Sequence, residues 1–393
     1  MAARHVAKLQ DVKPALSGLL RSFKYSEVDI RLAAPEQLQA KPDVDSLVFG
    51  KYFTDHMIKI NYHDALGGWQ KPSILPVENI SLHPAAKVLH YAIELFEGMK
   101  AYRGVDDKIR MFRPDLNMKR MNDSASRSGL PNFDSGEMIK LLARLLQIDQ
   151  EWVPHSPTAS LYIRPTLIGI DPQLGMTASE SALLFAICSP VNSYFKEGFQ
   201  ALSLLADPKY TRSWPGGCGD KKMGSNYAPT VQVQREAFAL GFQQVLWLYG
   251  EEDYVTEAGT MNIFIIIKSD DGQKELITPP LNGLILPGVT RASILDVARE
   301  QRRMKVTERD ITMKEMIQLS KKGRILEMFG AGTACIVSPI ASIEYKGERY
   351  KIPTMEHDEK EFENFLKTLT SIQYGHIKHP WGFCIDDYCK NGT

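Results

Sequence analysis

The chain has 393 residues, more than one ordinary hydrophobic core accommodates, so two domains of roughly 150 to 200 residues are expected. Its 47 Lys and Arg balance 47 Asp and Glu, and its apolar runs are far shorter than the roughly 20 residues that span a bilayer, so the composition favours small-molecule chemistry over a nucleic-acid partner or membrane insertion. The cysteines form no Cys-x-x-Cys pair, so we expect no metal site, no disulfide framework and a reducing compartment; they are Cys188, Cys218, Cys335, Cys384 and Cys389.

The first 24 residues are basic and contain apolar residues at helical spacing, with Asp11 as the one acid. This composition resembles an import presequence, so residues 1–26 are a candidate presequence and a mitochondrial matrix location is favoured. The alternative is an amphipathic helix or an extension on a cytoplasmic protein. The basic residues of this stretch are Arg4, Lys8, Lys13, Arg21 and Lys24.

Residues 27–192 are expected to form a small α/β domain. The stretch 27–46 is polar and rich in proline, which is typical of a lead-in segment. Residues 138–148 have the apolar spacing of an amphipathic helix. Alternation or short apolar runs predict strands at 53–62, 109–112, 160–168 and 182–187.

A segment rich in turn residues follows the last of these strands, so we place an interdomain linker at 193–198. The second domain is expected to span 199–375, and residues 376–393 form a C-terminal tail with no predicted role. In the second domain, the apolar pattern predicts helices at 229–240, 291–301 and 361–371, and strands at 245–249 and 261–268.

Two neighbouring lysines, Lys221 and Lys222, lie within a glycine-rich stretch of this second domain. Glycines allow a backbone to pass close to a bound ligand, and Trp214 and Tyr227 are available as walls. A lysine in such a pocket suits an enzyme that carries pyridoxal phosphate through a Schiff base. Spacing alone does not choose between the two lysines. The glycines are Gly216, Gly217, Gly219 and Gly224.

An isolated acid, Glu257, precedes the apolar strand that contains Ile263-Phe-Ile-Ile-Ile267. A carboxylate bonded to the pyridine nitrogen of the cofactor would keep that nitrogen protonated and make the ring an electron sink. The alternative is a surface acid at a strand edge, which is common in folded proteins.

Two segments could hold a phosphate group. In Leu286-Pro-Gly-Val-Thr-Arg291 a Pro-Gly turn opens a helix, so free N–H groups and the Thr290 hydroxyl point to one place. The stretch Gly330-Ala-Gly-Thr-Ala-Cys335 offers similar groups in a turn. Neither segment has the spacing of a nucleotide-binding loop, which weighs against nucleotide chemistry.

A third set combines aromatic and basic residues. Such a set can line a substrate pocket, and its alternative is a group of core aromatics with surface arginines. Its members are Tyr91, Phe96, Arg120, Tyr162 and Arg164.

Together these segments closely resemble the branched-chain amino acid aminotransferases, in the fold-type IV group of pyridoxal-phosphate enzymes. The resemblance runs from about Val48 to Tyr374. It implies an α+β (α/β two-domain) fold in which a small open α/β domain faces a larger pseudo-barrel domain, with the active site at their interface. Its most specific segments are Leu95-Phe-Glu-Gly98, Phe112-Arg-Pro114, Leu161-Tyr-Ile-Arg-Pro165, Gln244-Val-Leu-Trp-Leu-Tyr-Gly250, Glu257-Ala-Gly-Thr-Met-Asn262, Ile285-Leu-Pro-Gly288 and Gly332-Thr-Ala-Cys335.

The resemblance assigns the cofactor residues. It implies that Lys222, rather than Lys221, is the catalytic lysine that binds pyridoxal 5'-phosphate and moves the substrate proton. Tyr227 would bond the ring hydroxyl and Glu257 the ring nitrogen. The other implied cofactor residues are Arg120, Arg212, Thr260, Val289, Thr290 and Thr333.

The same resemblance implies a reversible ping-pong transfer of the amino group of leucine, isoleucine or valine to 2-oxoglutarate. Arg164 would match the side-chain carboxylate of glutamate. A homodimer is implied, with Tyr91 and Met176 reaching the pocket across the interface. The substrate pocket would be lined by Phe49, Phe96, Tyr162, Arg164, Tyr194, Thr333 and Ala334.

The chain departs from the family pattern in a few places. Animal members often have Cys-x-x-Cys after the Gly-Thr-Ala turn, but here the stretch is Cys335-Ile-Val-Ser338, so a two-thiol switch is in doubt. Ser225 and Ala228 stand where glycine is usual. Two alternatives remain: a D-amino acid aminotransferase or aminodeoxychorismate lyase of the same fold group, and a non-catalytic protein that binds pyridoxal phosphate.

Overall fold

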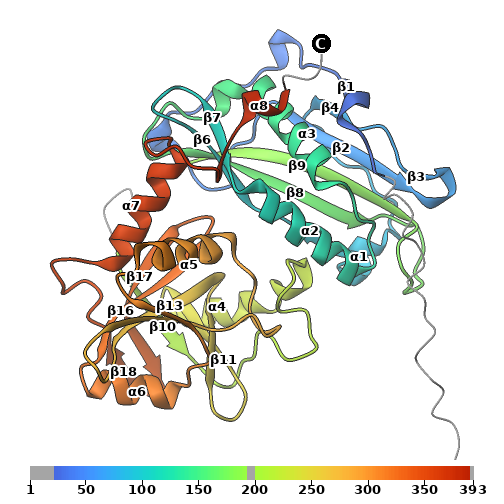
Figure 1. Cartoon of the computed structure of the whole chain (residues 1–393). Coiled ribbons are helices and arrows are strands. Elements are labelled where there is room, and N and C mark those ends of the chain that lie inside the picture. The colour runs from blue at the N-terminus through green and yellow to red at the C-terminus, as the bar shows by residue number, and fades with distance from the viewer. Residues whose placement is uncertain (1–21, 193–199, 390–393) are drawn as a thin grey trace, which may run out of the picture.

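A computed structural model describes residues 22–192 and 200–389. Most of the candidate presequence, the whole of the expected linker and Tyr194 therefore lie outside the described residues. The chain forms two bodies, each built around its own sheet, with the N-terminal half in blue and green and most of the C-terminal half in yellow and orange (Figure 1).

The first sheet is open and mainly antiparallel, with strand order β1-β4-β2-β9-β8-β6-β7-β19, β3 on β2 and β5 on β8. Only β1 and β4 pair in parallel among its described strands. Its strands are β1 (Asp29–Ile30), β2 (His56–His63), β3 (Gly68–Trp69), β4 (Ser73–Pro76), β5 (Glu94–Phe96), β6 (Met99–Arg103), β7 (Ile109–Phe112), β8 (Ser160–Gly169), β9 (Ser181–Val191) and β19 (Gly382–Cys384).

Helices cover one face of this sheet. In α3 (Ser135–Ile148) the Asp134 carboxylate accepts a hydrogen bond from the Glu137 N–H, which caps the helix start, and the apolar positions are fully buried. The predicted helix is confirmed and begins one turn earlier. The remaining helices of this half are α1 (Lys87–Tyr91), α2 (Pro114–Ser128) and α8 (Ile385–Cys389).

The second sheet contains a closed ring, because β12 pairs with both β11 and β13. The ring runs β12-β11-β10-β17-β16-β13 and returns to β12, with β14 and β15 beyond β13 and β18 beside β17. The pseudo-barrel implied by the resemblance is therefore confirmed. Its strands are β10 (Leu202–Ala206), β11 (Gln244–Tyr249), β12 (Tyr254–Ala258), β13 (Met261–Lys268), β14 (Lys274–Thr278), β15 (Lys305–Glu308), β16 (Ile325–Gly332), β17 (Ile336–Tyr345) and β18 (Glu348–Lys351).

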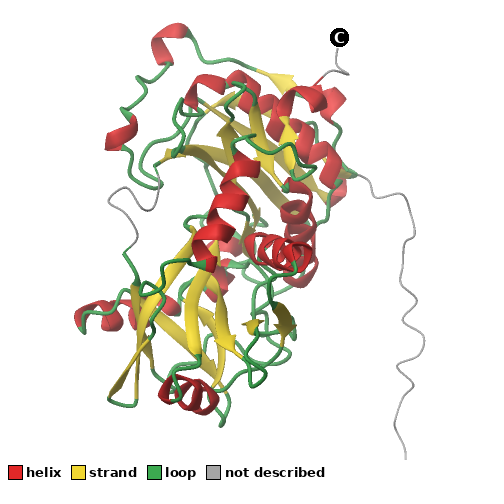
Figure 2. Cartoon of the chain, turned by 60° about the vertical axis from the view of Figure 1, so that its left-hand side comes forward, coloured by secondary structure: helices red, strands yellow, loops and turns green. Residues whose placement is uncertain are grey.

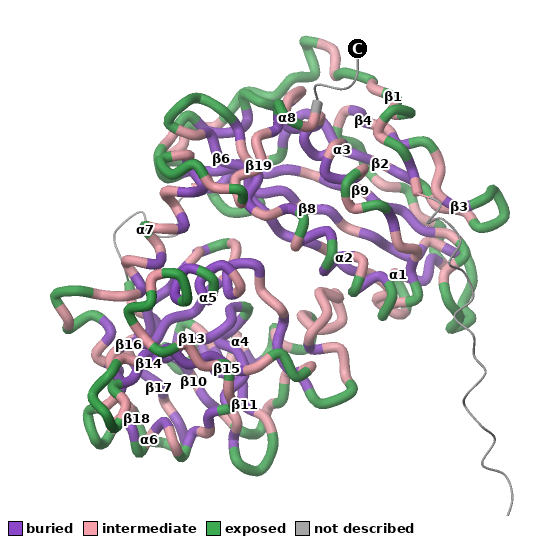
Figure 3. The backbone as a smooth tube through the Cα atoms, in the orientation of Figure 1, coloured by how far each residue is buried: buried purple, intermediate pink, exposed green. Residues whose placement is uncertain are grey.

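The barrel core follows directly from the apolar run at Ile263–Ile267, which is buried on both faces of β13 (Figure 3). Four helices pack around it: α4 (Thr230–Ala239), α5 (Val289–Gln301), α6 (Met313–Lys321) and α7 (Glu361–Gln373). Short 3-10 helices occur at Tyr25–Glu27, Pro35–Gln37, Val44–Ser46, Asp64–Leu66, Gln150–Trp152 and Gly224–Asn226. No helix of the described residues is long and apolar enough to cross a membrane.

The C-terminal segment returns to the first half of the molecule. Helix α7 lies between the two bodies (Figure 2), and β19 then pairs with β7, with Gly382 opposite Phe112. Helix α8 packs against α3. The expected tail at 376–393 therefore has a structural role in its described part, because residues 382–384 extend the first sheet and residues 385–389 form a helix beside it. The other domain boundaries stay predictions.

Candidate active site

A cavity of about 310 Å³ lies between the first sheet and the barrel. Most of the predicted site residues meet there although they come from distant parts of the chain. The predicted residues that line it are Phe49, Phe96, Arg120, Tyr162, Arg164, Lys222, Tyr227, Glu257, Thr260, Val289, Thr290, Thr333 and Ala334.

Lys222 is the lysine of the glycine-rich stretch that faces this cavity. Its Nζ lies 3.0 Å from the Tyr227 hydroxyl and 4.8 Å from the centre of the Phe96 ring. Its backbone N–H donates to the Ser124 hydroxyl at 2.9 Å, which fixes the main chain at this point. Lys221 instead forms an ion pair with Asp220 at 2.7 Å. The geometry therefore separates two lysines that spacing could not.

Asn226 holds the lysine loop in shape. Its Nδ2 donates to the carbonyls of Cys218 and Lys221 at 2.7 and 2.8 Å. The four glycines of this stretch have a different role from the one predicted, because none of them lines the cavity. A Cβ at Gly224, for example, would lie 1.8 Å from the Glu94 carboxylate, so this glycine allows close packing within the protein.

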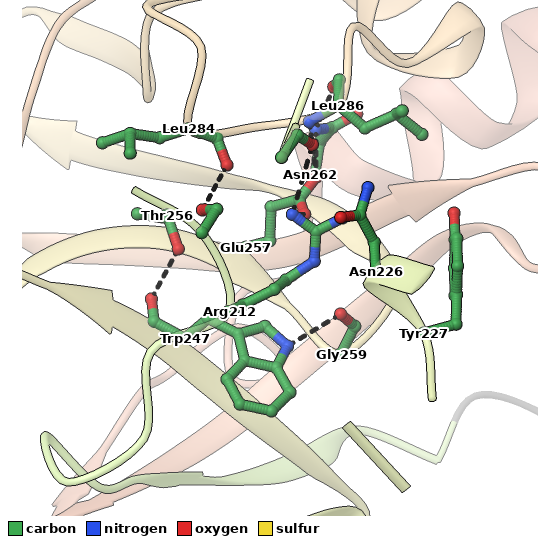
Figure 4. Close-up of polar contacts among 12 residues, drawn as sticks. Arg212, Asn226, Tyr227, Trp247, Thr256, Glu257, Gly259, Asn262, Leu284 and Leu286 are labelled. Atoms are coloured by element: carbon green, nitrogen blue, oxygen red, sulfur yellow. Dashed lines mark hydrogen bonds and ion pairs between the residues drawn. The ribbon is translucent and has the colours of Figure 1, made fainter. Parts of the chain in front are cut away.

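Glu257 is 2 % exposed, which excludes the surface-acid alternative. Its carboxylate forms an ion pair with Arg212 at 2.8 Å and accepts hydrogen bonds from Asn262 Nδ2 at 3.0 Å and the Leu286 N–H at 3.1 Å (Figure 4). Burial raises the pKa of Glu257, and Arg212 and the Leu286 N–H oppose that shift. The result is a fixed carboxylate at the cavity wall.

Arg212 lies behind Glu257 and is not among the residues that line the cavity, so it acts on the site through Glu257. The turn between β12 and β13 is fixed from the barrel side, because the Trp247 indole N–H donates to the Gly259 carbonyl at 2.9 Å (Figure 4). This turn places Thr260 on the cavity wall.

The start of α5 also opens on the cavity. Gly288 is the residue before its first turn and supplies no side-chain cap, and Val289 and Thr290 follow at the cavity wall. Asn262 needs a glycine here, because a Cβ on Gly288 would lie 2.0 Å from its Oδ1. The N–H groups of a helix start attract anions, so this part of the cavity wall is suited to an anionic group.

Arg120 is held by Glu97, a residue that we did not single out from the sequence. Arg120 Nε and Nη2 donate to the two Glu97 oxygens at 2.7 Å each, and Nη1 donates to the Pro287 carbonyl at 3.1 Å. Glu97 is fully buried and also accepts from Asn117 at 2.8 Å. The pair keeps the guanidinium group beside the start of α5.

Phe96, Tyr162 and Arg164 of the aromatic and basic set form another part of the wall with Phe49. The Phe49 and Tyr162 rings lie 5.0 Å apart, and the Arg164 guanidinium lies 4.6 Å from the Phe96 ring centre. Arg164 also donates to the Tyr162 hydroxyl at 3.0 Å. These contacts favour the pocket interpretation over scattered core aromatics and surface arginines.

Tyr91 and Met176 lie outside the cavity of this chain. The Tyr91 hydroxyl donates to the Leu174 carbonyl, and Met176 is 77 % exposed on the same loop. Their predicted role across a dimer interface stays a prediction. Tyr194 lies outside the described residues.

Several residues of the site were not found from the sequence. Glu97, Asn117, Asn226 and Asn262 act by holding other side chains or backbone groups, and they carry no spacing of their own. The only available signal was their presence in or next to the quoted segments: Glu97 lies in Leu95-Phe-Glu-Gly98 and Asn262 closes Glu257-Ala-Gly-Thr-Met-Asn262.

Solved structures with this fold include a branched-chain aminotransferase from Thermoproteus uzoniensis with norvaline, with a TM-score of 0.67 and 23 % identity, covering 79 % of this chain and 96 % of that one. A branched-chain amino acid aminotransferase from Thermobaculum terrenum in its PLP form has a TM-score of 0.66 and 20 % identity, covering 84 % and 98 %. These similarities establish the fold.

Sequence comparison is more specific. The family described as amino-transferase class IV matches residues 94–343. The cytosolic branched-chain-amino-acid aminotransferase of Rattus norvegicus is 55 % identical, over 90 % of this chain and 86 % of that protein. The mitochondrial enzyme of Bos taurus is 49 % identical, over 92 % of each. The lysine, the buried acid and the helix start of this cavity all lie within the matched region, and the chain is a member of the class IV aminotransferases, in the branched-chain-amino-acid aminotransferase family.

Proposed function

We propose that this protein transfers the amino group of L-leucine, L-isoleucine or L-valine to 2-oxoglutarate, reversibly and by a ping-pong mechanism. The products are a branched 2-oxo acid and L-glutamate. The observation that carries the proposal is the meeting of Lys222 and the buried Glu257 in one cavity that also has an aromatic wall.

The cofactor is pyridoxal 5'-phosphate, and the residues present fit it. The Lys222 amine would bind its aldehyde, Tyr227 lies beside that amine, and the fixed Glu257 carboxylate would pair with its ring nitrogen. The start of α5, with Thr290 and the neighbouring Arg120, suits its phosphate group. When bound, pyridoxal phosphate supplies an electron sink for the charge that develops at the substrate Cα.

The protein's own residues supply the acid–base chemistry. Lys222 Nζ would hold the cofactor and would take and return the proton at the substrate Cα. The Tyr227 hydroxyl, 3.0 Å away, keeps this amine in place. Glu257 stabilises positive charge at the ring nitrogen, and its bonds from Arg212 and Asn262 keep it from turning away.

The aromatic wall supports the choice of substrate. Phe49, Phe96 and Tyr162 form an apolar surface that suits a branched side chain. Arg164 at the same wall supplies a cation for the second carboxylate of glutamate, and its Nε has no hydrogen-bond partner among the described residues. One pocket can therefore serve both substrates in turn.

Two measurements test the function. Borohydride reduction of the purified protein followed by peptide mass mapping should give a pyridoxyl adduct on Lys222. Amino-group transfer to 2-oxoglutarate should be fast from L-leucine and absent from D-alanine. An adduct on Lys221 would contradict the assigned lysine, and a preference for D-alanine would favour the D-amino acid aminotransferase alternative. A folded protein with an adduct and no turnover would favour the non-catalytic alternative.

We also infer a homodimer in which Tyr91 and Met176 of one chain complete the pocket of the other. The exposed apolar side chains Leu89, Leu174 and Met176 beside Tyr91 support an interface at this place. Light scattering should give twice the chain mass. A Met176→Glu variant should dissociate and lose activity together, and a fully active monomer would contradict the proposal.

A mitochondrial matrix location is supported by the basic composition of the first 24 residues. Relatives named as cytosolic and relatives named as mitochondrial both match the chain closely, so similarity does not choose between the compartments. Imaging of a fusion that carries a C-terminal fluorescent protein tests the proposal, with diffuse cytosolic fluorescence as the contrary result.

A further inference from the structure

Lys100 is a buried amine beneath one wall of the cavity, and the proposed reaction gives it no role. It lies on β6, is 6 % exposed, and donates through Nζ to the Ala334 carbonyl at 2.8 Å. Among residues 22–192 and 200–389, no carboxylate lies within ion-pair distance of this Nζ. A buried ammonium with one carbonyl partner is costly, because the charge has left water without a counter-charge.

A second buried lysine shows the difference. Lys87 is fully buried and donates to the Thr177 carbonyl and hydroxyl and to the Ala178 carbonyl, at 2.9 to 3.1 Å. Asp171 lies 3.6 Å from the same Nζ. The environment of Lys87 is that of a structural lysine with its donors used. Within the described part of the chain, Lys100 has only the Ala334 carbonyl as a partner, so stability alone does not account for a lysine at this position.

The group that Lys100 holds is a strained turn. Ala334 lies in the connection between β16 and β17, and Ile336 at the end of that turn has a φ of 62°. A β-branched residue is an outlier in this left-handed region, and such strain persists only where the surroundings enforce it. The turn therefore needs to be held from outside.

The first sheet holds this turn at two points. The Thr333 hydroxyl donates to the Gly98 carbonyl at 3.1 Å, and Lys100 donates to Ala334. Both bonds cross from one half of the molecule to the other, and Thr333 and Ala334 both line the cavity.

We propose that Lys100 is a positioning residue for substrate binding. Its ammonium group holds the Ala334 carbonyl, keeps the strained turn against the first sheet, and places a positive charge beneath the cavity wall that Thr333 and Ala334 form. This charge would attract the carboxylate that the amino acid and the 2-oxo acid share. The inference deepens the proposed function and rests on it. Lys100 is outside the cavity lining, so it acts through the turn and through its charge, without touching the substrate.

Electrostatics agree with this role. Burial lowers the pKa of Lys100 to about 8, and the group on the turn that faces it is the Cys335 thiol, whose own pKa burial raises to about 11. The amine therefore stays charged at neutral pH without a fixed anion beside it. A bound carboxylate would supply the missing negative charge.

Lys100→Met tests the proposal, because methionine keeps most of the volume and removes the donor and the charge. We expect the KM values for L-leucine and for 2-oxoglutarate both to rise by about tenfold, with kcat changed less than threefold and Tm unchanged or higher. Hydrogen–deuterium exchange without substrate should be faster in peptides that contain Thr333 to Ile336. The matched control is Lys59→Met, a partly exposed strand lysine of the same sheet that pairs with Glu78, and it should leave both KM values and the exchange of this turn unchanged.

Unchanged KM values in an active Lys100→Met enzyme would overturn the proposal. So would a fall in Tm with faster exchange throughout the first sheet, since that is the result of a purely structural role. If the methionine variant does not fold, Lys100→Gln retains a neutral donor and should show a smaller rise in KM. If the parent protein itself lacks transaminase activity, the proposed function fails, while the exchange of the turn still decides whether Lys100 clamps it.

Discussion

The two walls of the cavity are built differently. The barrel wall is polar, and its side chains have several fixed partners each: Glu257 contacts Arg212, Asn262 and the Leu286 N–H. The wall from the first sheet is mainly aromatic, and its members meet through ring and cation contacts and the hydrogen bond from Arg164 to Tyr162, with Phe49 54 % exposed. A closed ring of strands carries the first set, and an open sheet with its preceding loop carries the second.

We infer that the two walls have different roles, with the polar wall suited to the cofactor and the aromatic wall suited to the substrates. Fixed polar groups suit the cofactor, whose chemistry is the same for every substrate, because preorganised charges need no rearrangement during the reaction. An aromatic wall with fewer fixed bonds suits side chains that differ in shape and charge. Substitutions in the barrel wall should therefore affect all substrates equally, whereas substitutions in the sheet wall should change their ratio.

The largest effect is expected at the lysine between the walls. Lys222→Ala removes the amine to which we assign cofactor binding and transfer of the Cα proton, so transamination of every substrate should fall by about 10⁴-fold. A coupled assay with L-leucine and 2-oxoglutarate measures it. Lys221→Ala is the matched control and should keep most activity, because its side chain pairs with Asp220. Substantial activity in the Lys222 variant would contradict the assigned role.

The next effect tests the barrel wall. Glu257→Ala should lower kcat by about 10²-fold to 10³-fold for leucine, valine and glutamate alike, since it removes the charge that stabilises the ring nitrogen. Cofactor retention, measured by absorbance after dialysis, should fall far less, because the phosphate contacts remain. Glu275→Ala, a barrel acid on β14 outside the cavity lining, serves as the control. An effect on one substrate only would contradict the division between the walls.

The sheet wall should show the opposite pattern. Arg164→Met should raise the KM for glutamate and 2-oxoglutarate by about 10-fold to 100-fold, because a charged partner of the second carboxylate is lost. The KM for leucine should change less than threefold. Steady-state kinetics with both amino donors measures the ratio. Equal losses for leucine and glutamate would show that Arg164 supports the wall as a whole.

The smallest effect concerns stability and pH. The Lys100 pKa of about 8 lies below its ordinary value of 10.5, so the unfolded chain binds more protons between these values. Burial of the Lys100 charge therefore lowers the free energy of unfolding below pH 8. This loss of stability disappears as the pH rises to 10.5, because the amine then loses its proton in both the folded and the unfolded chain. Lys100→Met lacks the cost at every pH. The variant should therefore have a higher free energy of unfolding than the parent protein at pH 8, and this difference, measured in urea, should decrease as the pH rises to 10.5. A difference that stays constant over this pH range would contradict the assigned charge.

Much of the site could be predicted because its chemistry needs rare patterns. A lysine in a glycine-rich stretch and an acid before an apolar strand remain recognisable without a structure, as Lys222 and Glu257 show. The choice between Lys221 and Lys222 required the resemblance or the fold, because it depends on the direction of each side chain. The role predicted for the glycines was wrong: Gly217, Gly219 and Gly224 allow close packing within the protein, and Gly216 has a φ of 79° with no neighbour near its Cβ position among the described residues.

Two of the residues that escaped prediction, Lys100 and Glu97, have partners well separated from them in sequence. Lys100 contacts Ala334 and Glu97 contacts Arg120. The sequence around Lys100 and around Glu97 contains no pattern that predicts these partners. The fold shows the same limit. The apolar spacing of α3 and the apolar run of β13 predicted these two elements. Strand β19 has only three residues, and it forms because it can pair with the edge of β7, which lies far earlier in the chain.

That late strand has a consequence for synthesis. The outer edge of β7 is covered only when β19 arrives, so a growing chain carries an open edge while roughly 270 further residues are made, which takes tens of seconds at about 5–20 residues per second. Open strand edges invite pairing with other chains. The nascent protein therefore carries this open edge until β19 has been made, and truncation before Gly382 would make that exposure permanent.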